Sequence, residues 1–159
     1  MKKMIKKELI KLSTGELASV LVFWWCYFMW FKENTIHVIY PLSVLCLILL
    51  QGSIYWFICL IRVIDKNIVF KRTGKYYFVL KYIDVLLMLG YIPILMISPT
   101  VKFKYYFWGV FLILFALVEF VNYFLFRLSY KNVGILISQI KTGRLRKSKL
   151  AKEIEISRV

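Results

Sequence analysis

Two acidic side chains, Asp84 and Glu119, stand inside long apolar stretches of this sequence. Asn122 follows Glu119 by three residues, which places the two on one face of a helix, and Gln51 lies in another apolar stretch. An acid at the centre of a bilayer costs ~2.5–3.5 kcal/mol on insertion scales, so it rarely faces lipid. We expect all four residues to point inward. They would either line a pathway or gate for protons or cations, or join helices in a polar network, and the network is favoured.

Residue types that support enzyme chemistry do not form a recognisable set. No nucleophile–base pair, phosphate-binding loop or metal-ligand cluster can be assembled, and His37, the single histidine, is expected at the outer membrane interface. Cys26, Cys46 and Cys59 lie in apolar surroundings without Cys-x-x-Cys spacing, which favours small buried hydrophobes over a metal or redox site. We expect no cofactor and no enzymatic activity. A membrane enzyme that uses the two intramembrane acids as an acid–base pair is a weaker alternative.

The elements that must position these residues are four apolar blocks, at 14–31, 41–61, 77–98 and 103–126. The chain is 61% hydrophobic with a mean hydropathy of +0.71, whereas a soluble domain is roughly 45–50% apolar. About 20 helical residues cross a hydrocarbon core of ~30 Å. The sequence therefore predicts an all-α polytopic membrane protein with four transmembrane helices, made of a domain over 1–130 and a basic helical tail over 131–159.

Helix boundaries are indicated by local signals. Ser13 followed three residues later by Glu16 matches a capping box, so we expect the first helix to begin after Ser13. Pro41 fits the first turn of the second helix, where a missing N–H costs nothing. Gly90 and Pro93 fall in the middle of the third block and predict a kink, which could act as a hinge.

The distribution of basic residues predicts the orientation. Twenty Lys and Arg residues flank the blocks on one side and three on the other, and basic loops stay in the cytoplasm. Both termini are therefore expected to be cytoplasmic, in the cytoplasmic (inner) membrane of a bacterium. The net charge of +15 is then a consequence of topology and of attraction to anionic lipid, and we expect no nucleic-acid partner.

A dense basic run in the tail predicts contact with anionic lipids or with a cytoplasmic protein; its residues are Arg144, Arg146, Lys147, Lys149 and Lys152. The first functional hypothesis is a non-enzymatic membrane subunit that anchors, or senses for, a cytoplasmic partner. The alternative is an oligomeric ion channel or a pore-forming effector of the immunity or toxicity type, built around the inward acids. Either function predicts a homo-oligomer or a hetero-complex.

Overall fold

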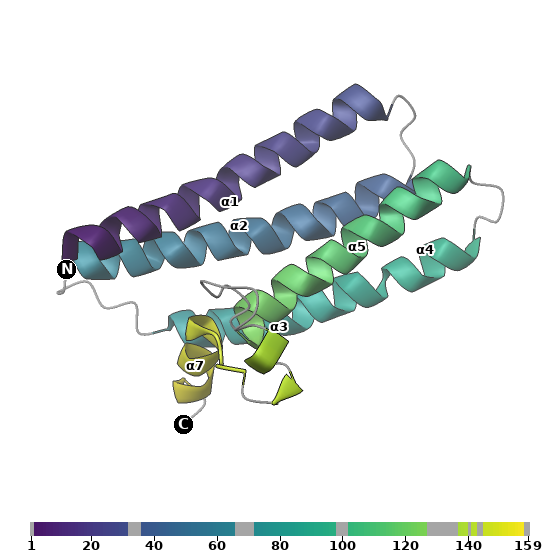
Figure 1. Cartoon of the computed structure of the whole chain (residues 1–159). Helices are drawn as coiled ribbons and strands as arrows, with labels where there is room; N and C mark the ends of the chain where they lie inside the picture. Colours follow the sequence, from purple (N-terminus) through teal and green to yellow (C-terminus); the bar gives the residue numbers. More distant parts are fainter. Residues whose placement is uncertain are drawn as a thin grey trace.

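The computed structural model describes residues 2–31, 36–65, 72–97, 102–126, 137–139, 141–142 and 145–157. Helices make up nearly all of the described chain (Figure 1): α1 (Lys2–Trp30), α2 (Ile36–Ile64), α3 (Thr73–Leu89), α4 (Tyr91–Ile97), α5 (Phe103–Phe124) and α7 (Lys149–Ile156). Four segments are long and apolar enough to span a membrane, namely α1, α2, α3 together with α4, and α5. The structure thus confirms the all-α class and the four long apolar helical segments.

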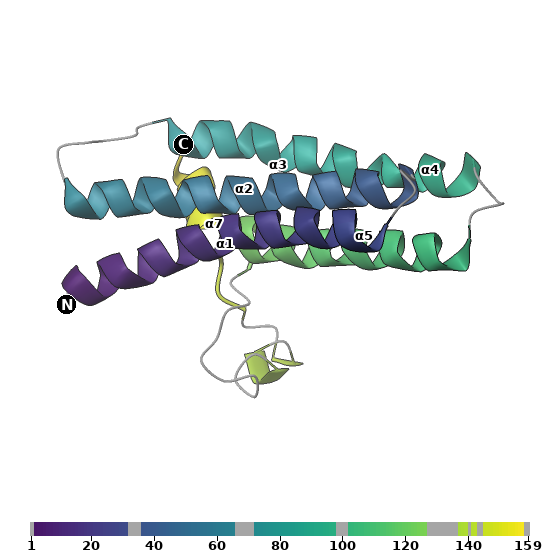
Figure 2. The same ribbon diagram turned by 90° about the horizontal axis from the view of Figure 1, so that it is seen from above.

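Helix α2 is the centre of the bundle. Of the residues in its most apolar stretch, 61% are buried, against 17% for α1, 11% for α3 with α4, and 33% for α5. Figure 2 shows α2 between α1 and α3, and α2 also contacts α5 along much of its length. Helices α1 and α5 meet through aromatic side chains, including Phe23 with Phe115 and Phe31 with Tyr105, whose ring centroids are 5.9 Å apart in both pairs. The buried face of α2 therefore holds the core that α1, α3, α4 and α5 cover.

Helix α1 begins at Lys2, so the predicted start after Ser13 is wrong. Ser13 lies inside the helix, where its hydroxyl bonds sideways to α2 instead of capping a helix end. It donates to the carbonyl of Ser53 at 3.1 Å, and the Ser53 hydroxyl donates to the Ser13 carbonyl at 2.8 Å. Small residues permit this close approach of two backbones, and the serine pair joins α1 to α2. Because α1 begins at Lys2, Glu16 lies well beyond the first turn of the helix.

Helix α2 begins at Ile36, so Pro41 lies inside the helix. The predicted position of Pro41 in the first turn is therefore wrong. Proline has no N–H to donate to the carbonyl four residues earlier, here that of His37. The hydroxyl of Tyr91 donates to this carbonyl at 3.0 Å. Gly109 leaves the space for this contact, since a Cβ at position 109 would lie 2.0 Å from the Tyr91 hydroxyl. The neighbouring helices thus satisfy the backbone group that proline frees.

The third apolar block is divided at Gly90 into α3 and α4. Tyr40 of α2 supports this break, because its hydroxyl donates to the carbonyl of Leu87 at 2.8 Å. A Cβ at Gly90 would lie 2.4 Å from the same hydroxyl oxygen. The interruption therefore falls near the predicted kink at Gly90 and Pro93, and its use as a hinge stays a prediction.

Candidate functional site

Among the predicted polar residues, Gln51 and Asp84 form a direct contact between α2 and α3. The Gln51 Nε2 donates to Asp84 Oδ1 at 2.9 Å, and Asp84 is fully buried, with an exposed fraction of 0%. Tyr77 of α3 donates its hydroxyl to the Gln51 carbonyl at 2.8 Å. These two hydrogen bonds join α3 to α2 within their apolar segments. Within one chain, Asp84 therefore serves as a contact between helices.

Glu119 and Asn122 form a second pair, on α5. The Asn122 amide lies 3.5 Å from the Glu119 carboxylate, and both side chains are partly exposed. Glu119 lines a groove of about 540 Å³ together with Glu8 and Glu16 of α1, and Asp84 is not among the residues of that groove. The structure thus brings the four predicted residues together as two pairs, and no hydrogen bond joins Asp84 to Glu119. A common pathway through them stays a prediction.

Tyr123 of α5 packs across α2 at Gly52. The ring is 4% exposed, and a Cβ on Gly52 would lie 2.5 Å from its Cζ atom. Only glycine at position 52 therefore leaves room for the ring. The carbonyl of Tyr123 accepts a hydrogen bond from the Ser148 hydroxyl, which connects this contact to the beginning of α7.

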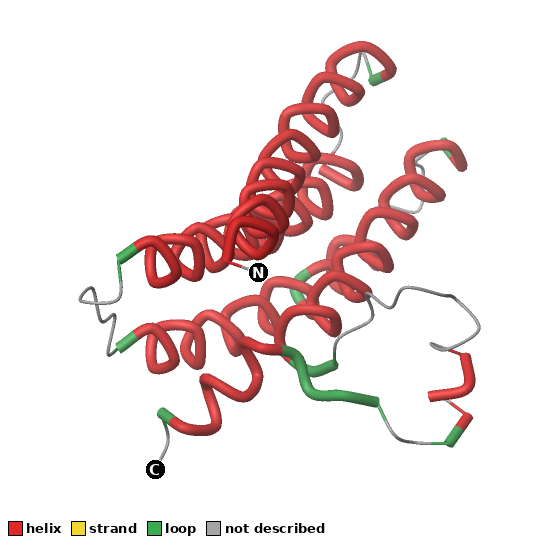
Figure 3. The backbone as a smooth tube through the Cα atoms, turned by 60° about the vertical axis from the view of Figure 1, so that its left-hand side comes forward, coloured by secondary structure: helices red, strands yellow, loops and turns green. Residues whose placement is uncertain are grey.

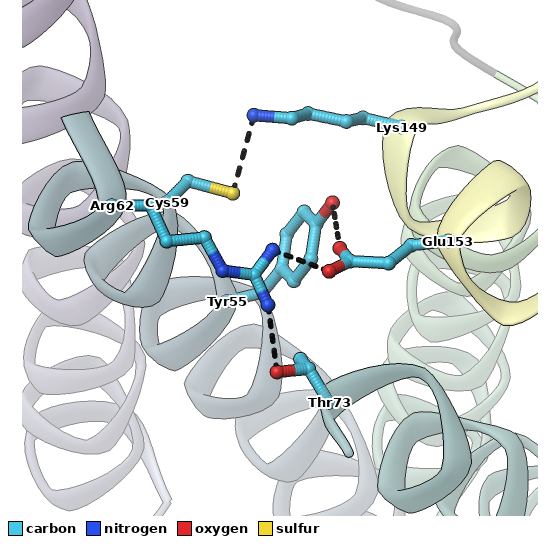
Figure 4. Close-up of polar contacts among 6 residues, drawn as sticks. All are labelled: Tyr55, Cys59, Arg62, Thr73, Lys149 and Glu153. Carbon is cyan, nitrogen blue, oxygen red and sulfur yellow. Dashed lines mark hydrogen bonds and ion pairs between the residues drawn. The ribbon is translucent and has the colours of Figure 1, made fainter. Parts of the chain in front are cut away.

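A group of polar side chains lies where α2, α3 and α7 meet (Figure 4), and of its members the sequence pointed only to Cys59 and Lys149. We call it the terminal cluster; its members are Tyr55, Cys59, Arg62, Thr73, Lys149 and Glu153. Glu153 of α7 is its centre, because it forms an ion pair with Arg62 and accepts a hydrogen bond from the Tyr55 hydroxyl at 3.0 Å. Arg62 also donates to Thr73 at 2.8 Å. The Arg62 and Glu153 side chains are only 26% and 25% exposed, so water screens this ion pair incompletely.

Helix α7 packs on the bundle through an apolar face and a cap. Leu150 and Ile154, four residues apart and thus on one face, are 2% and 6% exposed. The Ser148 hydroxyl accepts from the Ala151 N–H at 2.9 Å and so caps the helix, while the Ser148 N–H donates to the Leu125 carbonyl at 3.1 Å. Figure 3 shows α7 beside the beginning of α3. Helix α7 therefore belongs to this end of the bundle, which we call the terminal end.

The basic residues of the tail have different surroundings. Lys147 bonds to both carboxylate oxygens of Glu155, at 2.9 and 2.8 Å, and this hydrogen bonding, with the lysine charge, lowers the pKa of the Glu155 carboxyl. The Lys149 ammonium lies 3.4 Å from the Cys59 sulfur. Arg146 and Lys152 are exposed, and Arg144 lies outside the described residues.

A pocket of about 470 Å³ lies between this basic segment and the first half of α1. The α1 side carries the apolar Ile5, Leu9 and Leu12 together with the acids Glu8 and Glu16, and another side carries the basic side chains of residues 146–152. In the part of the chain that the structure describes, no group of three or more His, Cys, Asp or Glu side chains could hold a metal ion. No protein-family model, curated protein or solved structure matches this chain.

Proposed function

We propose that this chain is a non-enzymatic membrane subunit that anchors, or senses for, a cytoplasmic partner at its terminal end. Large apolar side chains on the outer faces support placement in a bilayer: Phe28 on α1 is 70% exposed, Leu86 on α3 is 68% and Phe103 on α5 is 80%. Soluble monomers rarely expose such continuous apolar surface. The basic residues around both chain ends favour a cytoplasmic terminal end in a bacterial inner membrane.

The observation that carries the proposal is the docking of α7. One face of α7 is fixed to the bundle by Leu150, Ile154 and the Glu153 contacts. The other face presents Ile156, which is 76% exposed, beside the charged Lys152 and Glu155. An apolar centre with a polar rim is the usual composition of a protein interface. A helix docked in this way presents one defined surface to a partner.

Two variants of exposed tail residues test the proposal. The tagged full-length chain would be purified from its native membrane in mild detergent, and the mass of the complex measured by native mass spectrometry. We expect a stoichiometric partner that is lost with Ile156→Glu and retained with Thr142→Glu, an exposed position outside α7. Thermal unfolding in detergent should be the same for both variants. A wild-type chain that is recovered alone, or a complex that survives Ile156→Glu, would contradict the proposal.

The oligomeric channel is the second candidate, and the groove lined by Glu16 and Glu119 favours it. Carboxylates that face the space between α1 and α5 could line a pathway shared by several copies. Purified protein in liposomes would then conduct cations, and Glu119→Gln would change the conductance while the buried Asp84→Asn would change mainly stability. Equal currents from wild type and Glu119→Gln would remove this groove from the mechanism.

A further inference from the structure

We propose that the pocket between α1 and residues 146–152 binds one anionic phospholipid, with the headgroup phosphate against the beginning of α7 and the upper acyl chain against α1. We call it the α1–α7 pocket. Its volume of about 470 Å³ lies in the range of ~300–1,000 Å³ that is usual for small-molecule sites. The inference depends on placement at a bilayer and not on the proposed protein partner.

The wall formed by α7 suits a phosphate group. Lys149 and Lys152 both line the pocket and, three residues apart, are neighbours on the helix surface. Lys147 is already paired with Glu155, whereas Lys152 makes no ion pair among the described residues. Lys149 donates one hydrogen bond to the Cys59 sulfur, so the other two N–H groups of its ammonium and the Lys152 ammonium remain for an anion on this wall.

The backbone at the start of α7 adds to the attraction. The first N–H groups of a helix have no acceptor within it, and the helix dipole makes this end positive. The Ser148 hydroxyl accepts from the N–H of Ala151 and not from those of Lys149 and Leu150, both of them pocket residues. The acids of the pocket, Glu8 and Glu16, lie on α1 and would repel the phosphate towards α7.

The apolar wall distinguishes a lipid from a water-soluble anion. Ile5 of α1, which is 40% exposed, and the half-buried Leu12 and Trp56 line the same pocket as the two lysines. A free phosphate ion would leave this wall in contact with water, whereas an acyl chain would cover it and gain the free energy of apolar burial. The juxtaposition of cationic and apolar walls therefore fits an amphiphile with a phosphate headgroup.

Native mass spectrometry of the full-length protein in detergent, titrated with phosphatidylglycerol or phosphatidylcholine, tests this site. We expect one phosphatidylglycerol to bind at least tenfold more tightly than phosphatidylcholine. Lys149→Gln/Lys152→Gln should weaken phosphatidylglycerol binding about tenfold or more, since each lysine contributes substantially to attraction by anionic lipid. The control Lys3→Gln/Lys75→Gln removes the same charge from exposed positions outside the pocket and should change binding less than twofold.

Three results would overturn the inference. Equal binding of the two lipids, or equal weakening by the control variant, would show that any contact is non-specific attraction. Competition by glycerol phosphate at concentrations equal to the lipid would show a site for a soluble anion. Phosphatidylglycerol with brominated acyl chains should also quench the fluorescence of Trp56, which is identified as the part of the signal that Trp56→Phe removes. Absence of that quenching would place the acyl chain elsewhere.

Discussion

Glu153→Ala should release α7 from the terminal end. The substitution removes the ion pair with Arg62 and the hydrogen bond from Tyr55. Hydrogen bonds to charged groups contribute about 1.5–3 kcal/mol each, but exposed ion pairs contribute only about 0–1 kcal/mol. Because a quarter of each side chain of the ion pair is exposed, we expect a total loss near the lower figure, about 1.5 kcal/mol. This corresponds to a roughly tenfold increase in the undocked population of α7.

The thiol of Cys59 reports this undocking directly. Cys59 is 1% exposed and lies under Lys149 of α7, so a maleimide can reach it only when α7 moves away. In a Cys26→Ala/Cys46→Ala background, Glu153→Ala should raise the rate of Cys59 labelling about tenfold, by the same conversion. Arg62→Ala should have a similar effect, and the double variant should be little worse than either, because both single variants remove the same Arg62–Glu153 ion pair.

Glu155→Ala is the matched control. It makes the same substitution two residues away on α7, but the Glu155 side chain is 62% exposed and, among the described residues, pairs with the exposed Lys147. Its labelling rate should stay within about twofold of the parent's, because water screens an exposed ion pair. The reasoning is refuted if Glu155→Ala accelerates labelling as much as Glu153→Ala does, or if Glu153→Ala leaves the rate unchanged.

Three further predictions concern stability, measured as thermal unfolding of the purified protein in detergent. Gly52→Ala should lower the free energy of unfolding by about 1–3 kcal/mol, because the added Cβ overlaps the Tyr123 ring. Gly15→Ala adds a Cβ in open space and should be neutral or stabilising. Equal effects of the two substitutions would contradict the packing argument. Asp84→Ala should lower the free energy of unfolding by about 1–3 kcal/mol, because it leaves the buried Gln51 amide without its acceptor. Asp84→Asn should lower it clearly less, and the opposite order would show that the charge itself is required. The pair with Lys147 that lowers the pKa of the Glu155 carboxyl stabilises the fold at pH above the ordinary pKa of glutamate, and this stabilisation is lost as the pH falls through the lowered pKa. Wild type should therefore be slightly more stable than Glu155→Gln at pH 6, and the two should converge in strong acid; a constant difference would contradict this.

The fold class could be predicted from the sequence because the length and apolar character of the blocks depend on the chain alone. The helix starts could not, because tertiary contacts determine them. Ser13 has the sequence context of a cap, yet its hydroxyl bonds to Ser53 of the neighbouring helix. Pro41 is accepted inside α2 only because Tyr91, 50 positions further along the chain, donates to the carbonyl that it frees.

The candidate site was predictable in part for similar reasons. Buried polar residues such as Gln51 and Asp84 are conspicuous in an apolar stretch, so their inward orientation can be expected from sequence. Arg62 and Glu153 have the appearance of ordinary surface charges, and 90 intervening residues separate them. They pair because the chain after α5 comes back to the end of the bundle where Arg62 lies, and this return is a property of the fold. The spacing of Leu150 and Ile154 behind Ser148 was the one sequence signal for a capped helix with an apolar face.

The placement of both chain ends on one side of a membrane is tested most directly by single cysteines introduced into a cysteine-free background. Lys3→Cys and Glu155→Cys are exposed positions at the terminal end, and Lys102→Cys is exposed at the other end of the bundle. With an impermeant maleimide, we expect intact cells to label Lys102→Cys alone and permeabilised cells to label all three. Labelling of Lys3→Cys and Glu155→Cys from different sides, or labelling of all three in intact cells, would contradict the account.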